Sequence, residues 1–163
     1  MNGSSSSAAA TVITPSFSKV GVRLSYFDEF IAIAQQGQTS LQGMTTTEVC
    51  DSIIKPATLA RKSSYCDMMA DQGHVAVGSA VVFYSHAWKY KFLDVVDALK
   101  AHFKATPDIV VWFDMFSNNQ HRAVSLDFDW WCGVFMSAIA DFRHVVMLLS
   151  PWGDPISLKR AWC

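Results

Sequence analysis

The chain has 163 residues, which is enough for one domain with its own core, and 51% of them are hydrophobic while 17% are charged. The formal net charge is −1 and the basic residues are scattered, so the sequence lacks the basic face that a nucleic-acid partner requires. Its apolar runs are shorter than the ~20 residues that a membrane-spanning helix needs, which excludes such a span.

The chain begins with a low-complexity tail, predicted over residues 1–20, whose first residues read MNGSSSSAAATV. This stretch has neither the basic start nor the apolar centre of a secretory signal. Its run of serine and alanine offers little to bury, so we expect the tail to be disordered.

Residues 21–73 are predicted to form a helical segment of three helices. The first has its apolar residues at helical spacing and ends at Gly37. The second opens with a capping box, Thr45 and Glu48, and is interrupted at Pro56. The third runs through the remainder of the segment.

From residue 74 to residue 163 the pattern changes to strands alternating with helices. Three apolar runs rich in β-branched residues lie at 80–84, 109–113 and 145–149. An amphipathic helix starting near Phe92 separates the first two runs, and a helix capped by Ser125 separates the last two. Continuous apolar strands joined by helices indicate a parallel sheet covered on both faces, so the predicted class is α/β.

Polar and aromatic side chains follow each apolar run. Because open parallel sheets bind ligands beyond the carboxyl ends of their strands, we expect these side chains to form a rim along one edge. The rim comprises Ser85, His86, Trp88, Asp114, Asn119, Gln120, Ser150 and Trp152. Indoles can stack on a flat ring while amides and a carboxylate orient polar groups, which favours a polar ligand that carries a ring.

Each of these residues also has a purely structural interpretation. His86 can be a packed histidine with one backbone hydrogen bond, Asp114 can cap the turn that follows it, and the amides at 118–120 can be ordinary loop residues. The remaining tryptophans of strands and helices are interpreted as core residues: Trp112, Trp130 and Trp131.

Other chemistries find less support in the sequence. The histidines have no metal-ligand spacing, so no metal site is predicted. The four cysteines are widely separated, without a C-x-x-C pair, and we expect free thiols in the reducing cytoplasm. A cysteine–histidine nucleophilic pair stays open, although nothing indicates which cysteine would serve. No glycine-rich dinucleotide or P-loop motif follows a strand, which disfavours ordinary dehydrogenases and P-loop nucleotidases.

Three segments in order, VVFYSHAW, VVWFDMFSNNQ and VVMLLSPW followed by LKRAWC, resemble the Toll/interleukin-receptor-like (TIR) domain, and more narrowly its divergent algal and protist type. The resemblance covers residues 80–163, with Ser85 in the first box, Asp114 in the second, and Ser150 preceding Trp162-Cys163 in the third. SHAW and WFDMFSNNQ are also similar to the fungal heterokaryon-incompatibility domain.

The resemblance implies a flavodoxin-like parallel sheet of five strands, of which this chain supplies three. Many TIR domains cleave NAD between nicotinamide and ribose, with a catalytic glutamate in the motif Trp-Cys-x-x-Glu. Here Trp162 and Cys163 are the last residues, so the glutamate would fall three positions later and no catalytic residue is expected in the chain as given. Trp162 joins the rim as a candidate for nucleotide binding, and Asp114 is assigned to loop organisation.

Three hypotheses therefore stand beside each other. The first is a cytoplasmic signalling domain that binds NAD as a substrate rather than as a tightly bound cofactor, and hydrolyses it in a longer form of the protein. The second is a non-catalytic interaction module that self-associates through TIR-like surfaces. The third is a structural fragment of helices and sheet with no independent function. The given chain is expected to be a carboxy-terminally truncated piece of a longer protein, with neither nucleic acid nor membrane as a partner.

Overall fold

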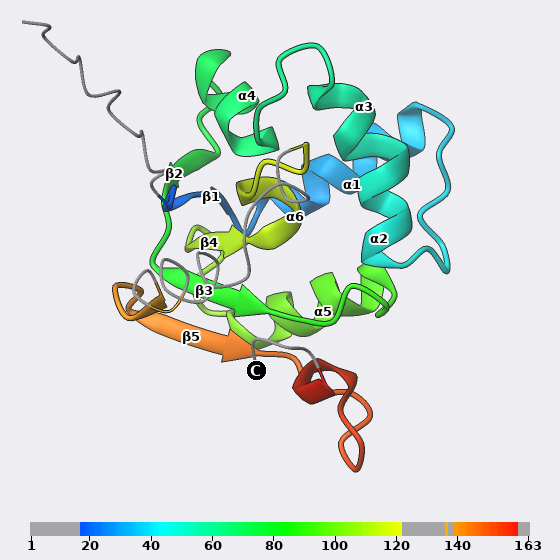
Figure 1. Cartoon of the computed structure of the whole chain (residues 1–163), viewed down its shortest axis with the longest axis vertical. Helices are drawn as coiled ribbons and strands as arrows, with labels where there is room; N and C mark the ends of the chain where they lie inside the picture. Colours follow the sequence, from blue (N-terminus) through cyan, green and yellow to red (C-terminus); the bar gives the residue numbers. More distant parts are fainter. Residues whose placement is uncertain (1–16, 122–135, 137–138, 160–163) are drawn as a thin grey trace, which may run out of the picture.

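A mixed five-stranded sheet lies at the centre of the computed structural model, which describes residues 17–121, 136 and 139–159 (Figure 1). The strands are β1 (Val20–Arg23), β2 (Val77–Ser79), β3 (Val82–Ser85), β4 (Val110–Phe113) and β5 (His144–Met147). Their order across the sheet is β2-β1-β4-β3-β5.

The three predicted strands are β3, β4 and β5, and the prediction that they run parallel is confirmed. Val82 of β3 pairs with Val111 of β4 on one side and with His144 of β5 on the other. The prediction of only three strands is wrong, because β1 pairs antiparallel with both β2 and β4. Both added strands are short, and β1 lies where the sequence predicted the end of the tail and the start of the helical segment.

The helices agree with the sequence in part. The bounds are α1 (Tyr26–Gln36), α2 (Thr46–Val49), the π-helix η1 (Cys50–Ile54), α3 (Lys55–Thr58), α4 (Tyr65–Asp71), α5 (Phe92–His102), α6 (Asp114–Ser117) and the 3-10 helix η2 (Ile156–Lys159). The predicted capping box is confirmed, since Thr45 accepts a hydrogen bond from the Glu48 amide and the Glu48 carboxylate accepts one from the Thr45 amide. The helix expected to begin near Phe92 is α5.

Pro56 does not interrupt the second helix as predicted. The chain instead widens into η1, in which the amide of Lys55 reaches back to the carbonyl of Cys50, and the helix then continues through Pro56 as α3. A π-turn changes which backbone amides and carbonyls pair with each other. Pro56, which has no N–H to donate, can therefore lie near the start of α3. The single helix predicted after Pro56 is also wrong, because α3 ends at Thr58 and α4 begins only at Tyr65.

One face of the sheet carries the main core, to which the helical segment and the strands both contribute. Phe116 of α6 is completely buried there. Its ring centroid lies 5.0–6.2 Å from those of five other aromatic side chains: Tyr26, Phe27, Phe30, Tyr65 and Phe113. On the opposite face a smaller cluster forms around Trp112, as predicted for a core tryptophan.

Two more predictions from the sequence concern a helix that begins at Ser125 and a membrane-spanning helix. The helix expected from Ser125, with Trp130 and Trp131, lies outside the described residues. No helix in the described part of the chain is both long and apolar enough to cross a membrane.

Candidate functional site

The predicted rim exists as a shared edge of the sheet. Because β3, β4 and β5 are parallel neighbours, the residues that follow them emerge on the same side, and Ser85, His86, Asp114 and Ser150 all lie there as predicted. However, β3 lies between the other two strands. The rim therefore divides into a corner where β3 meets β4 and a corner where β3 meets β5.

At the β3/β4 corner, Asp114 organises the surrounding loops. Its Oδ2 accepts a hydrogen bond from the Trp88 indole at 2.8 Å, and its Oδ1 accepts one from the Asn118 amide at 2.8 Å. The Gln120 amide donates to the Asp114 backbone carbonyl at 2.9 Å. Both carboxylate oxygens are thus engaged within the protein, which fits the expected role in loop organisation.

The helical segment covers this corner. His86 is 1% exposed, and its Nε2 lies 3.1 Å from the hydroxyl of Thr46 at the start of α2. The backbone amides of Thr46 and Thr47 donate to the carbonyls of Tyr90 and Trp88 in the loop after β3. The first turn of α2 is therefore fixed against that loop, and the interpretation of His86 as a packed histidine is favoured over direct ligand contact.

The loop after α6 is fastened to the same segment. The Nε2 of His121 lies 2.9 Å from the Thr58 hydroxyl, and the Asn119 amide donates to the Lys62 carbonyl at 2.6 Å. The side-chain Oδ1 of Asn119 also accepts from the His121 backbone amide at 3.0 Å. The rim residue Asn119 and its neighbour His121 thus join the sheet edge to the helical segment.

The cysteines near this corner are poor nucleophiles. Burial raises the pKa of Cys50 to about 12, and burial likewise raises the pKa of Cys66 to about 12. A thiol needs a lowered pKa to be a reactive thiolate at neutral pH, so neither fits a cysteine–histidine pair. Within the described residues, no group of three metal-ligating side chains forms either.

The β3/β5 corner has a different character. The chain passes from β3 to β4 on one side and then returns across β3 to β5 on the other, so the strand order reverses between β3 and β5. Ligands of open α/β sheets bind at such a reversal point, where the loops diverge. By that rule the expected crevice lies between the loop after β3 and the loop after β5.

Tyr90 spans this corner. Its hydroxyl donates to the backbone carbonyl of Ser150, accepts from the Ser150 amide at 3.0 Å, and lies 3.3 Å from the Ser157 hydroxyl. Ser157 in turn donates to the Leu148 carbonyl at 2.7 Å. Tyr90 therefore holds both ends of the loop that follows β5, and this loop extends away from the sheet (Figure 1).

Two predicted residues lie on this loop and are open to solvent. Ser150 is exposed, and Trp152 is 83% exposed. Ser85, at the end of β3, is half-buried. Trp162 lies outside the described residues.

No family model, curated protein or solved structure significantly matches this chain. The sequence motifs alone carry the TIR-like resemblance.

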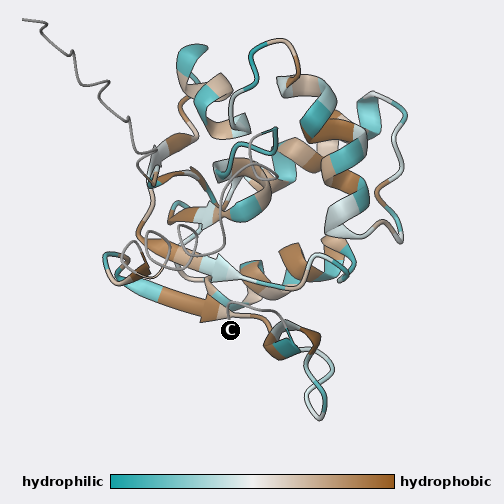
Figure 2. Ribbon diagram, in the orientation of Figure 1, coloured by the Kyte–Doolittle hydropathy of each residue, from teal (hydrophilic) through white to brown (hydrophobic). Residues whose placement is uncertain are grey.

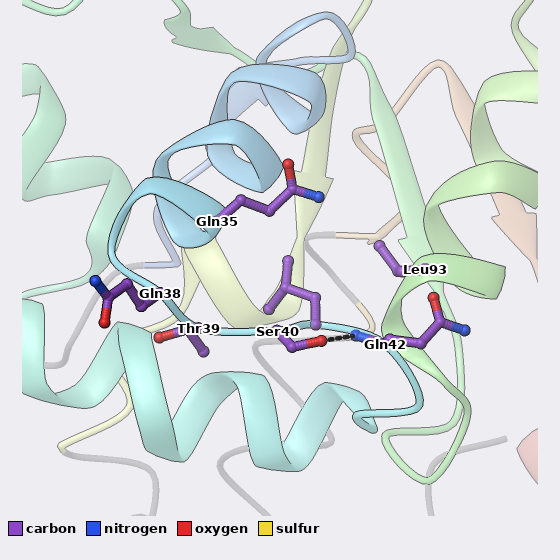
Figure 3. Close-up of a pocket in the computed structure, with 7 residues that line it drawn as sticks. Gln35, Gln38, Thr39, Ser40, Gln42 and Leu93 are labelled. Carbon is purple, nitrogen blue, oxygen red and sulfur yellow. Dashed lines mark hydrogen bonds between the residues drawn. The ribbon is translucent and has the colours of Figure 1, made fainter.

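A hollow of about 310 Å³ lies apart from the sheet edge, between the end of α1, the loop after it and α5 (Figure 3). It is lined by Gln35, Gln38, Thr39, Ser40, Leu41, Gln42 and Leu93. None of these is a predicted site residue. The hollow and the rim are thus separate features.

Sequence reasoning missed three residues that hold the rim. Tyr90 joins the loops after β3 and β5, while Thr46 and Thr58 lie against His86 and His121. The sequence does place Tyr90 in the polar loop directly after the VVFYSHAW segment. Nothing local marked the two threonines, because their partners are 40 and 63 positions away in the chain.

Proposed function

We propose that the chain is a TIR-like signalling module with a flavodoxin-like parallel sheet, and that it binds NAD at the β3/β5 corner. Support for the topology comes from the order β4-β3-β5. If β3, β4 and β5 are numbered 1, 2 and 3 along the chain, their order across the sheet is 2-1-3. The flavodoxin-like order, 2-1-3-4-5, begins in the same way. The antiparallel strands β1 and β2 extend the sheet beyond its β4 side.

The observation that carries the binding proposal is the exposed Trp152 on the loop that leaves β5 at the reversal point of the sheet. An indole open to solvent presents a flat apolar face on which a nicotinamide or adenine ring stacks. Ser150 and Ser85 supply hydroxyl groups at the same corner, suited to ribose and amide groups. Tyr90 serves here as a positioning residue, because it fixes the base of the loop that carries Trp152.

Cleavage of NAD makes a further demand, which is a carboxylate free to face the ribose. Asp154, on the same loop as Trp152, is held in an ion pair with Lys159 at 2.6 Å. Departure of nicotinamide builds positive charge on the ribose carbon, and a nearby carboxylate stabilises that charge. Asp114 is a carboxylate of the rim, but it is held by Trp88 and Asn118 at the other corner. We therefore propose binding without cleavage for the chain as given.

The binding proposal is tested by calorimetric titration of the chain with NAD. Replacement of Trp152 by alanine is expected to weaken binding about tenfold, since stacking of a base on an aromatic ring is worth about 1–3 kcal/mol. Trp152→Phe should retain most of the affinity. Leu158→Ala is the matched control, because Leu158 is exposed on the same loop region but offers no ring. Equal affinity in Trp152→Ala and the wild type contradicts the proposed site.

The proposal of binding without cleavage is tested by incubating the chain with NAD and separating nicotinamide chromatographically. We expect no release above that of a buffer control, and no change in Asp114→Asn. Release that disappears in Asp114→Asn, while the circular dichroism spectrum is unchanged, contradicts both this proposal and the assignment of Asp114 to loop organisation.

The alternative, a non-catalytic interaction module, also has a specific observation in its favour. The polar groups of the β3/β4 corner are used in hydrogen bonds within the protein, and large apolar side chains are exposed on and after β5. A folded chain that shows no heat of NAD binding favours this alternative.

A further inference from the structure

The helix α1 ends in a hydrogen-bond pattern that usually contains a glycine. Past its last turn, the Gln38 amide donates to the Gln35 carbonyl at 3.0 Å, and the Thr39 amide donates to the Ala34 carbonyl at 3.0 Å. This pair of bonds is the Schellman motif, and it places Gln38 in the left-handed region with φ at 62°. A residue with a Cβ atom is strained in this region, so glycine usually takes the position.

The helix α4 ends in the same motif with the usual residue. There the Gly73 amide donates to the Ala70 carbonyl at 2.9 Å, and the His74 amide donates to the Met69 carbonyl at 3.0 Å. Gly73 takes the left-handed position with φ at 70°. α1 has a glycine too, but Gly37 lies one position earlier, at a φ of −74° that any residue can adopt. The chain therefore keeps a side chain in α1 where α4 uses glycine, and strain of this kind gathers at functional sites.

The side chain kept at this position, that of Gln38, lines the hollow of about 310 Å³ at the end of α1. Figure 2 shows the end of α1 in the teal of hydrophilic residues, and none of the described residues that line the hollow is charged. Three of them carry primary amides, and Figure 3 shows these spread around the hollow: Gln35, Gln38 and Gln42. In the described part of the chain these three side chains make no hydrogen bond, whereas those of Asn119 and Gln120 hold loops at the rim. The hollow thus presents amides that are free to bind a ligand.

We propose that this hollow binds a neutral pyranose sugar. Each glutamine side chain offers two N–H donors and one carbonyl acceptor, and the hydroxyl groups of a sugar, which both donate and accept, match this set. A pyranose carries its hydroxyl groups around a ring, just as the amides are spread around the hollow (Figure 3). Leu41 and Leu93 add apolar side chains to the lining, which suit the C–H groups of the sugar ring.

Ligands of other chemical classes lack a matching group in the hollow. Phosphates and carboxylates are recognised by cations, and ammonium groups by carboxylates, but the described lining has neither kind of side chain. The volume lies at the lower end of the ~300–1,000 Å³ of small-molecule sites, which favours one sugar ring over a longer ligand. The described lining also has no aromatic ring for stacking, so we expect weak binding. Because the hollow is separate from the sheet edge, sugar binding does not depend on the binding of NAD.

The first test is a titration of isotope-labelled protein followed by nuclear magnetic resonance, in which glutamine side-chain amides give signals of their own. The probes are methyl α-glucopyranoside, methyl β-galactopyranoside and N-acetylglucosamine. Glycerol is the control for a flexible polyol, and sodium acetate is the control for a charged ligand. At least one of the sugars is expected to shift the amide signals of Gln35, Gln38 and Gln42 until they saturate. The absence of a saturable shift with all of the sugars, or an equal shift with glycerol or acetate, overturns the proposal.

The second test uses Gln38→Gly, which separates binding from stability. Glycine relieves the strain at this position, so the variant is expected to unfold about 2 °C above the wild-type temperature. Its affinity for the sugar is expected to fall about fivefold, because one hydrogen bond between uncharged groups is lost. Gln36→Ala is the matched control, since Gln36 belongs to the same helix but does not line the hollow, and its affinity should equal that of the wild type.

Three results of this second test overturn the proposal. Wild-type affinity in Gln38→Gly shows that the side chain is not used for binding. A lower unfolding temperature in Gln38→Gly shows that the side chain is retained for stability. Equal losses of affinity in Gln36→Ala and Gln38→Gly show that the sugar does not bind in the hollow.

Discussion

Replacing Phe116 by alanine is expected to lower the free energy of unfolding by about 3–5 kcal/mol. Phe116 is completely buried and lies against five other aromatic rings contributed by α1, α4 and β4. Removing its ring leaves a cavity at the point where the helical segment meets the sheet. The loss is measured by urea denaturation followed by tryptophan fluorescence and circular dichroism.

Phe103→Ala is the control for the loss in the free energy of unfolding. Phe103, at the end of α5, is only partly buried, so its removal opens less of a cavity and should cost clearly less. Phe116→Leu should recover part of the loss, because leucine fills part of the same volume. Similar losses for Phe116→Ala and Phe103→Ala contradict the central place of Phe116 in the core.

Replacing Gly21 by alanine is expected to destabilise the fold by about 3 kcal/mol. A Cβ atom at Gly21 would lie 2.3 Å from the Val111 carbonyl oxygen, a distance that requires the backbone of β1 or β4 to move. Gly78→Ala, on the neighbouring strand β2, is the matched control. The nearest atom to a Cβ there is a methyl group of Val110 at 3.7 Å, which is ordinary contact.

Thermal unfolding of both glycine variants checks this prediction. Gly78→Ala should unfold close to the wild-type temperature, whereas Gly21→Ala should unfold at least several degrees lower. Equal midpoints for Gly21→Ala and the wild type show that β1 does not approach β4 as closely as described.

The parallel part of the sheet was predictable from sequence, and the antiparallel part was not. β3, β4 and β5 each overlap a continuous run of apolar, β-branched residues, a signal strong enough to recognise without knowing the pairing partners. β1 has four residues and contains Gly21, and β2 has three and contains Gly78. Such strands are defined by pairing with distant residues, so their own sequence carries little of the signal.

The shared edge of the rim was predictable from the sequence, but its division into two corners was not. Position after a strand indicates which edge a residue occupies, and this placed Ser85, Asp114 and Ser150 together. β3 lies between β4 and β5 because of the way the chain crosses the sheet. The pattern of apolar residues does not indicate this crossing. The covering of His86 by α2 was unpredictable for the same reason, since Thr46 belongs to a segment in which no chemistry was recognised.

The pairing of β1 has a consequence for synthesis of the protein on the ribosome. Arg23 pairs with Val110, so β1 leaves the exit tunnel long before β4 is made. Until then the buried side chains of α1, among them Phe27 and Phe30, have no sheet to cover them. Contacts between such distant residues form late and slowly. The nascent chain therefore exposes the apolar face of α1 until β4 has been made.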